Sequence, residues 1–269
     1  MRVKVSIAIL AVIALLAIYS LPHLRAASAP ELPPASDGSR TPVLVELFTS
    51  EGCSDCPPAD ALLEKLDRSQ PVGGAELVVL SEHVDYWDDT GWRDPYSSHE
   101  YSERQNAYAG QFNLDSVYTP QMVVDGRFEL VGSDERRALA AIANAARTAK
   151  LPVSISAVHL ETPNVVSLHV NVGQLPSAFA TASAEVWIAA ADESDESHVS
   201  RGENAGRNLK HIAVLRSLTR AGTVDRAGEF SRDVRININQ GSAAGLRLVA
   251  IVQEPAGRVL GVASARLPN

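Results

Sequence analysis

The chain has 269 residues, of which 45% are hydrophobic and 21% are charged, and its formal net charge is −8 at pH 7. This composition is that of an ordinary globular protein with room for two domains, and it excludes a disordered chain and a bundle of membrane helices. An acidic chain is poorly suited to bind nucleic acid or anionic lipid, so we expect no nucleic-acid partner.

Residues 1–29 have the pattern of an export signal. Arg2 and Lys4 precede an apolar stretch over residues 5–21, and small residues follow at positions 26–29. The stretch is slightly long for a cleaved signal and slightly short for a membrane-spanning helix. We therefore predict either a signal peptide or an uncleaved N-terminal membrane anchor. In both cases the rest of the chain leaves the cytoplasm, and we expect a periplasmic or secreted protein.

Cys53 and Cys56, the two cysteines of the chain, stand between a predicted strand over residues 43–49 and a helical pattern that opens with Pro57 and Pro58. Two sulfur atoms three residues apart at the first turn of a helix can close a disulfide with little backbone movement. In an oxidising compartment they can pair only with each other or with a partner protein. We predict a redox-active pair, with a structural disulfide and a metal site as alternatives.

The first turn of the predicted helix also affects the reactivity of the pair. Its free N–H groups and the helix dipole favour a thiolate at Cys53, which we expect to be the more exposed sulfur. Glu51, Asp55 and Asp60 lie nearby and oppose this effect. A moderately acidic thiol of this kind suits a reductase or an isomerase better than a strong oxidant.

A second group of candidates follows the next predicted strand, over residues 76–80. A strand–helix–strand connection of this length predicts a right-handed parallel crossover. The carboxyl ends of parallel strands share one edge of a sheet, where open α/β sheets hold their sites. We therefore expect His83, Asp85 and Trp87 to lie near Cys53.

The elements that follow complete a familiar order. A helical pattern begins near position 98, two strands flank the turn sequence DG at 125–126, and an alanine-rich helix runs to about residue 149. This order resembles the thioredoxin fold, in which a cis-proline opens the third strand. Thr119-Pro120 stands in that position, so the resemblance implies a cis bond there. We predict a linker over residues 30–40 and a thioredoxin-like α/β domain over residues 41–150.

Four segments resemble one family more narrowly. ELFTSEGCSDCPPAD, HVDYWDDTGWRDP, YTPQMVVDGR and VGSD occur in the order found in bacterial secreted proteins assigned to domain of unknown function 1223, which have a thioredoxin-like domain. The resemblance covers most of the chain after the signal, but it implies little about activity. The family's motif positions correspond to Cys53, Cys56, His83, Asp85, Trp87, Trp92 and Pro120.

Beyond residue 150 the apolar period changes from helical to alternating, which predicts an all-β immunoglobulin-like sandwich domain over residues 151–269. The polar segment over residues 192–208 is the expected mobile loop of this domain. Arg201 and Arg207 in that segment, with His211 just after it, form either an anion or partner site or ordinary surface charge.

The site candidates suggest a division of roles. Cys53 would attack a substrate disulfide, Cys56 would resolve the mixed disulfide, and Pro120 would present its backbone to the substrate. His83 would act as general base or proton shuttle for Cys56, or it would only fix its loop through a hydrogen bond to Asp85 or backbone.

Aromatic residues near this edge are candidates for substrate contact. Trp87 and Trp92 would line a groove for an extended peptide, with Thr119 and Asp85 beside them, and packing in the core or a lid is the alternative.

These features predict an exported thiol–disulfide oxidoreductase of the reductase or isomerase type. We expect a protein thiol or disulfide as substrate, an unidentified redox partner that recycles the pair, and no cofactor. The second interpretation is a copper- or zinc-binding protein, because Cys53, Cys56 and His83 would form a Cys₂His set suited to Cu(I) or Zn²⁺. The third is a non-catalytic thioredoxin-like binding module.

Overall fold

A computed structural model describes residues 40–238 and 245–268. The predicted signal or anchor over residues 1–29 and the linker up to residue 39 therefore lie outside the described part of the chain. Among the described residues, no helix has the length and apolar character needed to cross a membrane.

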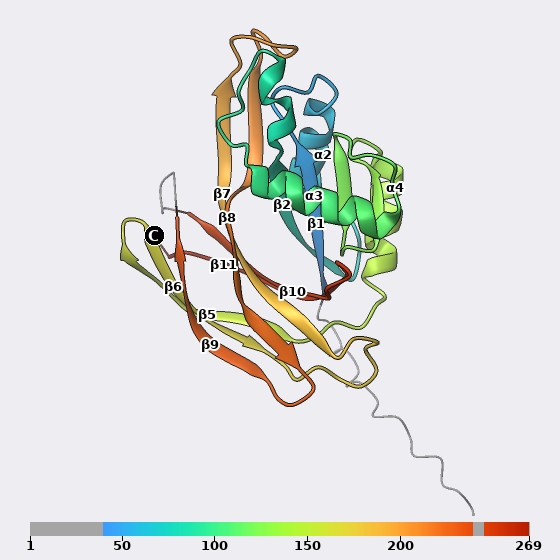
Figure 1. The fold of residues 1–269 in the computed structure, drawn as a ribbon, viewed down its shortest axis with the longest axis vertical. Helices are drawn as coiled ribbons and strands as arrows, with labels where there is room; N and C mark the ends of the chain where they lie inside the picture. The colour runs from blue at the N-terminus through green and yellow to red at the C-terminus, as the bar shows by residue number, and fades with distance from the viewer. Residues whose placement is uncertain (1–39, 239–244, 269) are drawn as a thin grey trace, which may run out of the picture. The chain divides into compact units, whose positions relative to one another are not determined.

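The first half of the described chain alternates strands and helices (Figure 1). Its elements are β1 (Thr41–Thr49), α2 (Pro57–Ser69), β2 (Ala75–His83), the 3₁₀ helix η2 (Asp85–Thr90), α3 (His99–Phe112), β3 (Gln121–Val124), β4 (Phe128–Val131) and α4 (Glu135–Ala145). Both later helices begin at side-chain caps, since Ser98 accepts a hydrogen bond from the N–H of Glu100 and Asp134 accepts one from the N–H of Arg137.

The second half consists of strands alone. They are β5 (Val153–Thr162), β6 (Val165–Val172), β7 (Ser183–His198), β8 (Asn208–Asp225), β9 (Phe230–Asn237), β10 (Arg247–Gln253) and β11 (Val259–Arg266). Strands β5, β6 and β9 form a three-stranded sheet. An apolar core that includes Leu168, Val186 and Leu248 joins this sheet to β7 and β10.

The other strands of both halves share one mixed eight-stranded sheet, in the order β11-β10-β7-β8-β2-β1-β3-β4. Strands β1 and β2 are parallel, as predicted, and place Thr49 opposite His83. Strand β8 joins the edge of β2 in parallel, with Ser81 opposite Val214. The sheet therefore continues through the point at which we predicted one domain to end and another to begin.

The predicted fold class is wrong. We expected a thioredoxin-like α/β domain followed by a separate immunoglobulin-like sandwich, but the protein is mostly β, with few helices and one large mixed sheet. The described residues fall within a single compact unit. The physical reason is that β2 does not end the sheet, because its free edge pairs with a strand more than a hundred residues further along the chain.

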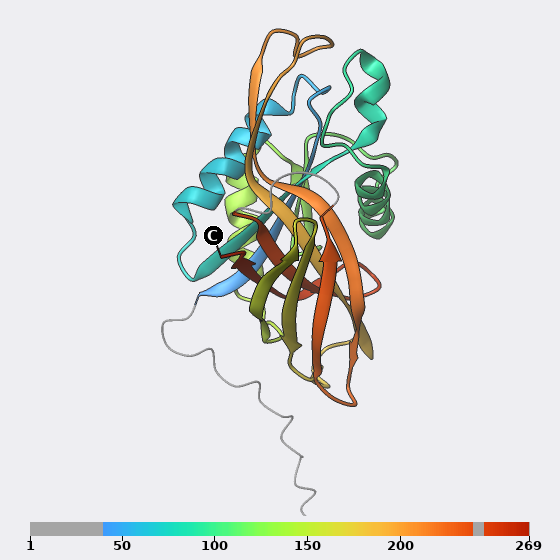
Figure 2. The same cartoon turned by 90° about the vertical axis from the view of Figure 1, so that its left-hand side faces the viewer.

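About half of the expected mobile loop over residues 192–208 is strand. Strand β7 continues to His198, β8 begins at Asn208, and these two residues pair with each other. Only residues 199–207 form a loop. We call residues 192–215 the β7–β8 arm and residues 199–207 its tip. Figures 1 and 2 show the arm, in orange, extending beside α2 and the segment after β1.

The two faces of β1 pack against different helices (Figure 2). Val45 and Leu47 belong to a core with residues of α2 and α4, whereas Phe48 packs with Tyr108 of α3. This alternation follows from the two-residue period of a strand. It holds the carboxyl end of β1, where the cysteines follow, between α2 on one side and the η2–α3 segment on the other.

Candidate functional site

Cys53 and Cys56 form a disulfide at the first turn of α2, with Cα atoms 5.4 Å apart. Cys56 is the N-cap of α2 and Pro57 occupies the first helical position, where no N–H is needed. The carbonyl of Cys56 accepts hydrogen bonds from the N–H groups of Ala59 and Asp60, at 2.8 and 3.1 Å. The predicted arrangement of strand, cysteine pair and helix is therefore present.

Cys53 was expected to be the more exposed of the two sulfurs, but the structure buries both. Cys53 is 1% exposed and Cys56 is 0% exposed. The tip of the β7–β8 arm covers this region, because buried Asn204 donates from Nδ2 to the carbonyls of Glu51 (2.8 Å) and Cys53 (2.9 Å). Glu203 accepts a hydrogen bond from the N–H of Ser54 at 3.1 Å. The tip of the arm therefore covers the cysteine loop, and both cysteines are shielded from solvent.

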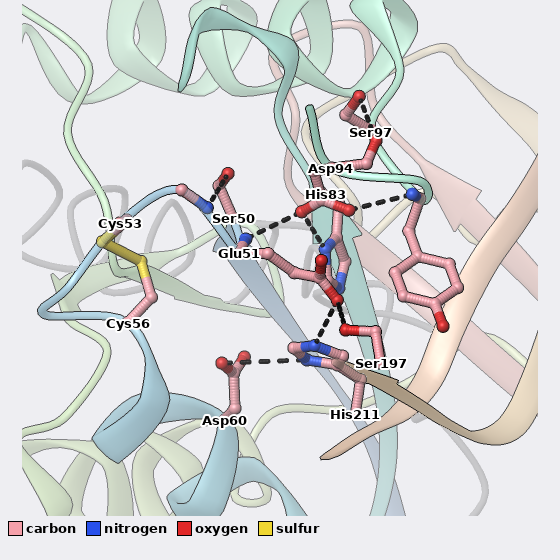
Figure 3. A network of polar contacts seen from close by, with 12 residues as sticks. Ser50, Glu51, Cys53, Cys56, Asp60, His83, Asp94, Ser97, Ser197 and His211 are labelled. Carbon is pink, nitrogen blue, oxygen red and sulfur yellow. Dashed lines mark hydrogen bonds and ion pairs between the residues drawn. A yellow bond between two sulfur atoms is a disulfide. The ribbon is translucent and has the colours of Figure 1, made fainter. Parts of the chain in front are cut away.

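The arm also places His211 of β8 beside the cysteine loop (Figure 3). His211 is 2% exposed; its Nε2 lies 3.3 Å from Oε1 of Glu51 and its Nδ1 lies 3.8 Å from Oδ2 of Asp60. Burial alone would lower the pKa of His211, but its polar contacts and charge interactions with Asp60 and Glu51 outweigh burial and raise the pKa to about 10. The ring is therefore an imidazolium at neutral pH.

Glu51 is the centre of these contacts. Its carboxylate accepts hydrogen bonds from Nε1 of Trp92, at 2.7 Å, and from the hydroxyl of Ser197 on the arm. Its backbone N–H donates to Oδ2 of Asp94 at 2.8 Å. Glu51 therefore joins the cysteine loop to the η2–α3 segment and to the arm.

His83 lies next in the same buried set. Its Nδ1 is 2.7 Å from Oδ2 of Asp94, and its ring packs edge to face on His211 with centroids 4.7 Å apart. Burial would raise the pKa of Asp94, but the charge and hydrogen bonds of His83 and two backbone N–H groups lower it. The expected partner Asp85 instead accepts a hydrogen bond from Ser102. We call this set the histidine cluster: Glu51, Asp60, His83, Asp94 and His211.

The structure brings only some of the other predicted residues to this place. Trp92 binds Glu51, as described, and Trp87 is close to the cysteine loop, since a Cβ added at Gly52 would lie 3.0 Å from its Cβ. The indole N–H of Trp87 donates to Oγ1 of Thr119 at 2.8 Å. The Thr119–Pro120 bond is cis, as predicted.

The predicted metal set is not assembled. Cys53 and Cys56 are bonded to each other, and Nδ1 of His83 is bonded to Asp94. Over residues 40–238 and 245–268, no group of three or more His, Cys, Asp or Glu side chains is arranged to hold a metal ion.

The contribution of the arm to this site was not predicted from the sequence. Ser197, Asn204 and His211 reach the cysteine loop only because β7 and β8 pair along their whole length. Arg207, a candidate surface charge, instead donates to Oδ1 of Asn204 at 2.9 Å and fixes the amide that covers the pair. Asp94 lies within HVDYWDDTGWRDP, one of the four segments that resemble the family, and this was the sequence feature that could have identified it as a site residue.

Comparison with known proteins decides the family. Residues 44–253 match the sequence profile of a family described as protein of unknown function (DUF1223). The chain belongs to this family. The predicted resemblance to DUF1223 is therefore confirmed. None of the curated proteins matches the chain.

Two solved structures resemble this DUF1223 protein. The crystal structure of a protein from Agrobacterium tumefaciens has a TM-score of 0.63 and 25% sequence identity, covering 87% of this chain and 97% of that one. The structure of HBP35 of Porphyromonas gingivalis has a TM-score of 0.63 at 13% identity, covering 85% of this chain and 76% of that one, and at this identity it supports the fold alone.

Proposed function

We propose that this protein is an exported thiol–disulfide oxidoreductase that acts through Cys53 and Cys56. The observation that carries the proposal is a disulfide at the first turn of α2, beside a buried cluster of ionisable side chains. Perturbed titratable groups next to a reactive group favour a functional role over a purely structural one. The assignment of export rests on the sequence pattern of residues 1–29.

The reaction follows from thiol–disulfide exchange. In the reduced protein, the thiolate of Cys53 attacks a disulfide of a protein substrate, forms a mixed disulfide and releases one substrate thiol. Cys56 then loses its proton and attacks the sulfur of Cys53, which releases the second substrate thiol and restores the Cys53–Cys56 disulfide. Two electrons pass to the substrate, and a dithiol partner returns two electrons to the pair.

Access to the pair requires movement of the arm tip. The hydrogen bonds from Asn204 and to Glu203 must break before a substrate disulfide reaches Cys53. Each such bond contributes about 1 kcal/mol net, so opening costs a few kcal/mol, which is within the range of local opening in native proteins. In the open state, Trp87 and Thr119 are the proposed contacts for the substrate.

A structural disulfide is the competing role, and the burial of Cys53 favours it. The two roles differ in turnover of insulin by dithiothreitol. An oxidoreductase accelerates insulin reduction, loses that activity in Cys53→Ser, and accumulates mixed disulfides with substrate in Cys56→Ser. A structural disulfide gives no turnover in any of the three proteins, and its removal lowers only the free energy of unfolding, by about 2 kcal/mol. That second pattern would contradict the proposal.

A further inference from the structure

The β7–β8 arm leaves the large sheet at a defined point (Figure 2). Strand β8 pairs with β2 at Val214, and from there toward the tip β7 and β8 pair with each other, as far as His198 and Asn208. A two-stranded ribbon is at best marginally stable by itself. The position of the arm therefore depends on the contacts that it makes with the rest of the protein, including those with the cysteine loop.

The base of the arm has the features of a hinge. Ala213 has a φ of +50°, in the left-handed region that a residue with a Cβ atom rarely adopts. A β-bulge follows, because Arg216 is an extra residue in the pairing of β8 with β7. Ala213 is fully buried in the core beside α2, so the arm is anchored there. We expect the tip to move by a turn about residues 213–216, since hinges are short segments that absorb a change in backbone angles.

The tip is held by backbone groups of the cysteine loop. The carbonyl of Cys53 accepts hydrogen bonds from the N–H of Cys56, at 3.3 Å, and from Nδ2 of Asn204, at 2.9 Å. One oxygen atom therefore belongs both to the turn that joins the two cysteines and to the contact with the arm. The other two bonds of the tip involve the carbonyl of Glu51 and the N–H of Ser54 on the same loop. A change in the turn between the cysteines therefore changes the groups that the arm binds.

Reduction of the disulfide changes this turn. Two bonded sulfur atoms become two thiols, which gain two hydrogen atoms and separate beyond bonding distance. Both cysteines are buried, and a close-packed interior has little room for this change. The extra volume has to come from movement of the cysteine loop or of the tip that covers it.

The charge of a thiolate acts in the same direction. The two histidines of the histidine cluster are already engaged by its three carboxylic acids. A thiolate at Cys53 adds negative charge two residues from Glu51. An ion without a compensating partner is far less costly in water than in the interior, whereas a disulfide has no charge to hydrate. The open position of the tip is therefore favoured more strongly in the reduced protein than in the oxidised one.

We propose that the β7–β8 arm is a redox-dependent latch, whose tip binds the cysteine loop while Cys53 and Cys56 are bonded and is released when they are reduced. This inference rests on the proposed thiol–disulfide exchange, because it requires a pair that is reduced in the folded protein. Coupled equilibria are reciprocal, so a tip that prefers the disulfide also stabilises the disulfide by the same factor. In the proposed reaction, the reduced protein presents Cys53 to its substrate and the oxidised protein is covered.

The equilibrium with glutathione tests the latch. Two glutathione thiols reduce the disulfide, which gives two cysteine thiols and one glutathione disulfide. Asn204→Ala removes both bonds of the tip amide, worth about a factor of 10 to 30 together. If the tip binds the oxidised form alone, the equilibrium constant for reduction rises by this factor, which is about 30–45 mV in midpoint potential. A lid that covers both redox forms equally would change the rates of reduction and re-oxidation but not this constant.

A control variant and a measurement on the wild type accompany this test. Arg201→Ala, at an exposed position of the tip, should keep the wild-type equilibrium constant. In the wild type, hydrogen exchange of the Ser54 amide reports the latch directly, because this N–H donates to Glu203. We expect its exchange to be at least tenfold faster after reduction. The amides that join β7 and β8 over residues 194–198 should stay protected in both states, because the arm turns as a unit.

The possible results separate the latch from the proposed function. Equal equilibrium constants in Asn204→Ala and Arg201→Ala, or equal exchange at Ser54 in both redox states, would overturn the latch, and insulin reduction by the wild type would leave the proposed function standing. Loss of protection along the whole arm after reduction would also overturn it, because the arm would then unfold. A shifted constant without turnover of insulin supports the latch and contradicts the proposed function. Reduction that occurs only with loss of the fold contradicts both.

Discussion

Strands β1 and β2 carry two buried clusters of charged side chains that differ in their cation. The histidine cluster lies at the carboxyl ends of the strands, beside the disulfide. The second, which we call the arginine cluster, lies on the opposite face of the strands, since Glu82 directly precedes His83 in β2, and it is covered by α3. Its members are Glu46, Glu82, Arg104, Tyr108 and Gln253.

The arginine cluster is held by a cation that does not lose its proton. Nε of Arg104 donates to Glu46 at 2.7 Å, and the hydroxyl of Tyr108 donates to the same carboxylate at 2.7 Å. Glu82 is only 3.6 Å from Arg104 and has no hydrogen-bond partner among the described residues. Burial, with the charge of Glu46, raises the pKa of Glu82 well above its usual value. Burial therefore favours the neutral form of Glu82.

The difference indicates which cluster can move protons. An arginine fixes the charge state of its neighbours, whereas imidazoles and carboxylates exchange protons readily. Of these two clusters, the histidine cluster is the one that includes a residue of the cysteine loop, Glu51, and the arm tip binds that loop through Asn204. We therefore propose that the arginine cluster stabilises the fold and that the histidine cluster takes part in the proposed thiol–disulfide exchange.

Arg104→Met should have the largest effect on stability. It leaves two buried carboxyl groups without their cation, and breaking a buried ion pair in this way costs about 3–5 kcal/mol. Urea denaturation measures the loss. Arg93→Met is the matched control, because Arg93 is 89% exposed and lies 3.8 Å from Asp88, and it should change stability by less than about 0.5 kcal/mol. A loss below about 1 kcal/mol in Arg104→Met would contradict a structural role for this cluster.

Asn204→Ala should expose the histidine cluster and the disulfide to solvent without unfolding the protein. It removes two hydrogen bonds that close the tip over the cysteine loop, worth about 2 kcal/mol together, so reduction by dithiothreitol should become roughly 30-fold faster. Trapping the new thiols with iodoacetamide measures the rate. Arg201→Ala, an exposed position in the same tip, should reduce at the wild-type rate. Equal rates in both variants would show that the tip does not control access.

Glu82→Gln should produce the smallest change, and only at higher pH. Because the pKa of Glu82 is raised in the folded protein, the wild type is at full stability below the usual value of 4.5 and loses stability as pH rises toward the folded pKa. Glutamine stays neutral, so the variant should match the wild type at pH 4 and be more stable than the wild type at pH 8. Glu76→Gln, at an exposed position of β2, should show no such pH dependence. A variant less stable than wild type at both pH values would show that Glu82 is charged and paired.

Local signals predicted the local structure well. The serine at position 98, the Asp125-Gly126 turn and the Cys53–Cys56 spacing each depend on residues within one or two turns of chain, and each has the expected geometry. The sequence also predicted that His83 would lie beside the cysteine loop, because that follows from a parallel crossover. Its partner Asp94 was not predicted, because a loop has no hydrophobic periodicity from which its contacts could be inferred.

The joined sheet could not be predicted for a physical reason. Residues 192–198 alternate between partly buried and exposed positions, but nearly all of them are acidic or serine, so they carry no hydrophobic period. The pairing of β8 with β2 is a contact between distant segments and has no local signature. The arm, and with it His211 and Asn204, was therefore absent from the predicted site.

We propose above all that the Cys53–Cys56 disulfide is reduced and re-formed while the protein stays folded. Redox titration in glutathione buffers, followed by thiol trapping together with near-UV circular dichroism, tests it most directly. We predict reversible reduction at a potential above about −300 mV with the circular dichroism signal retained. Reduction that occurs only as the tertiary signal is lost would show that the disulfide is structural and would contradict the account.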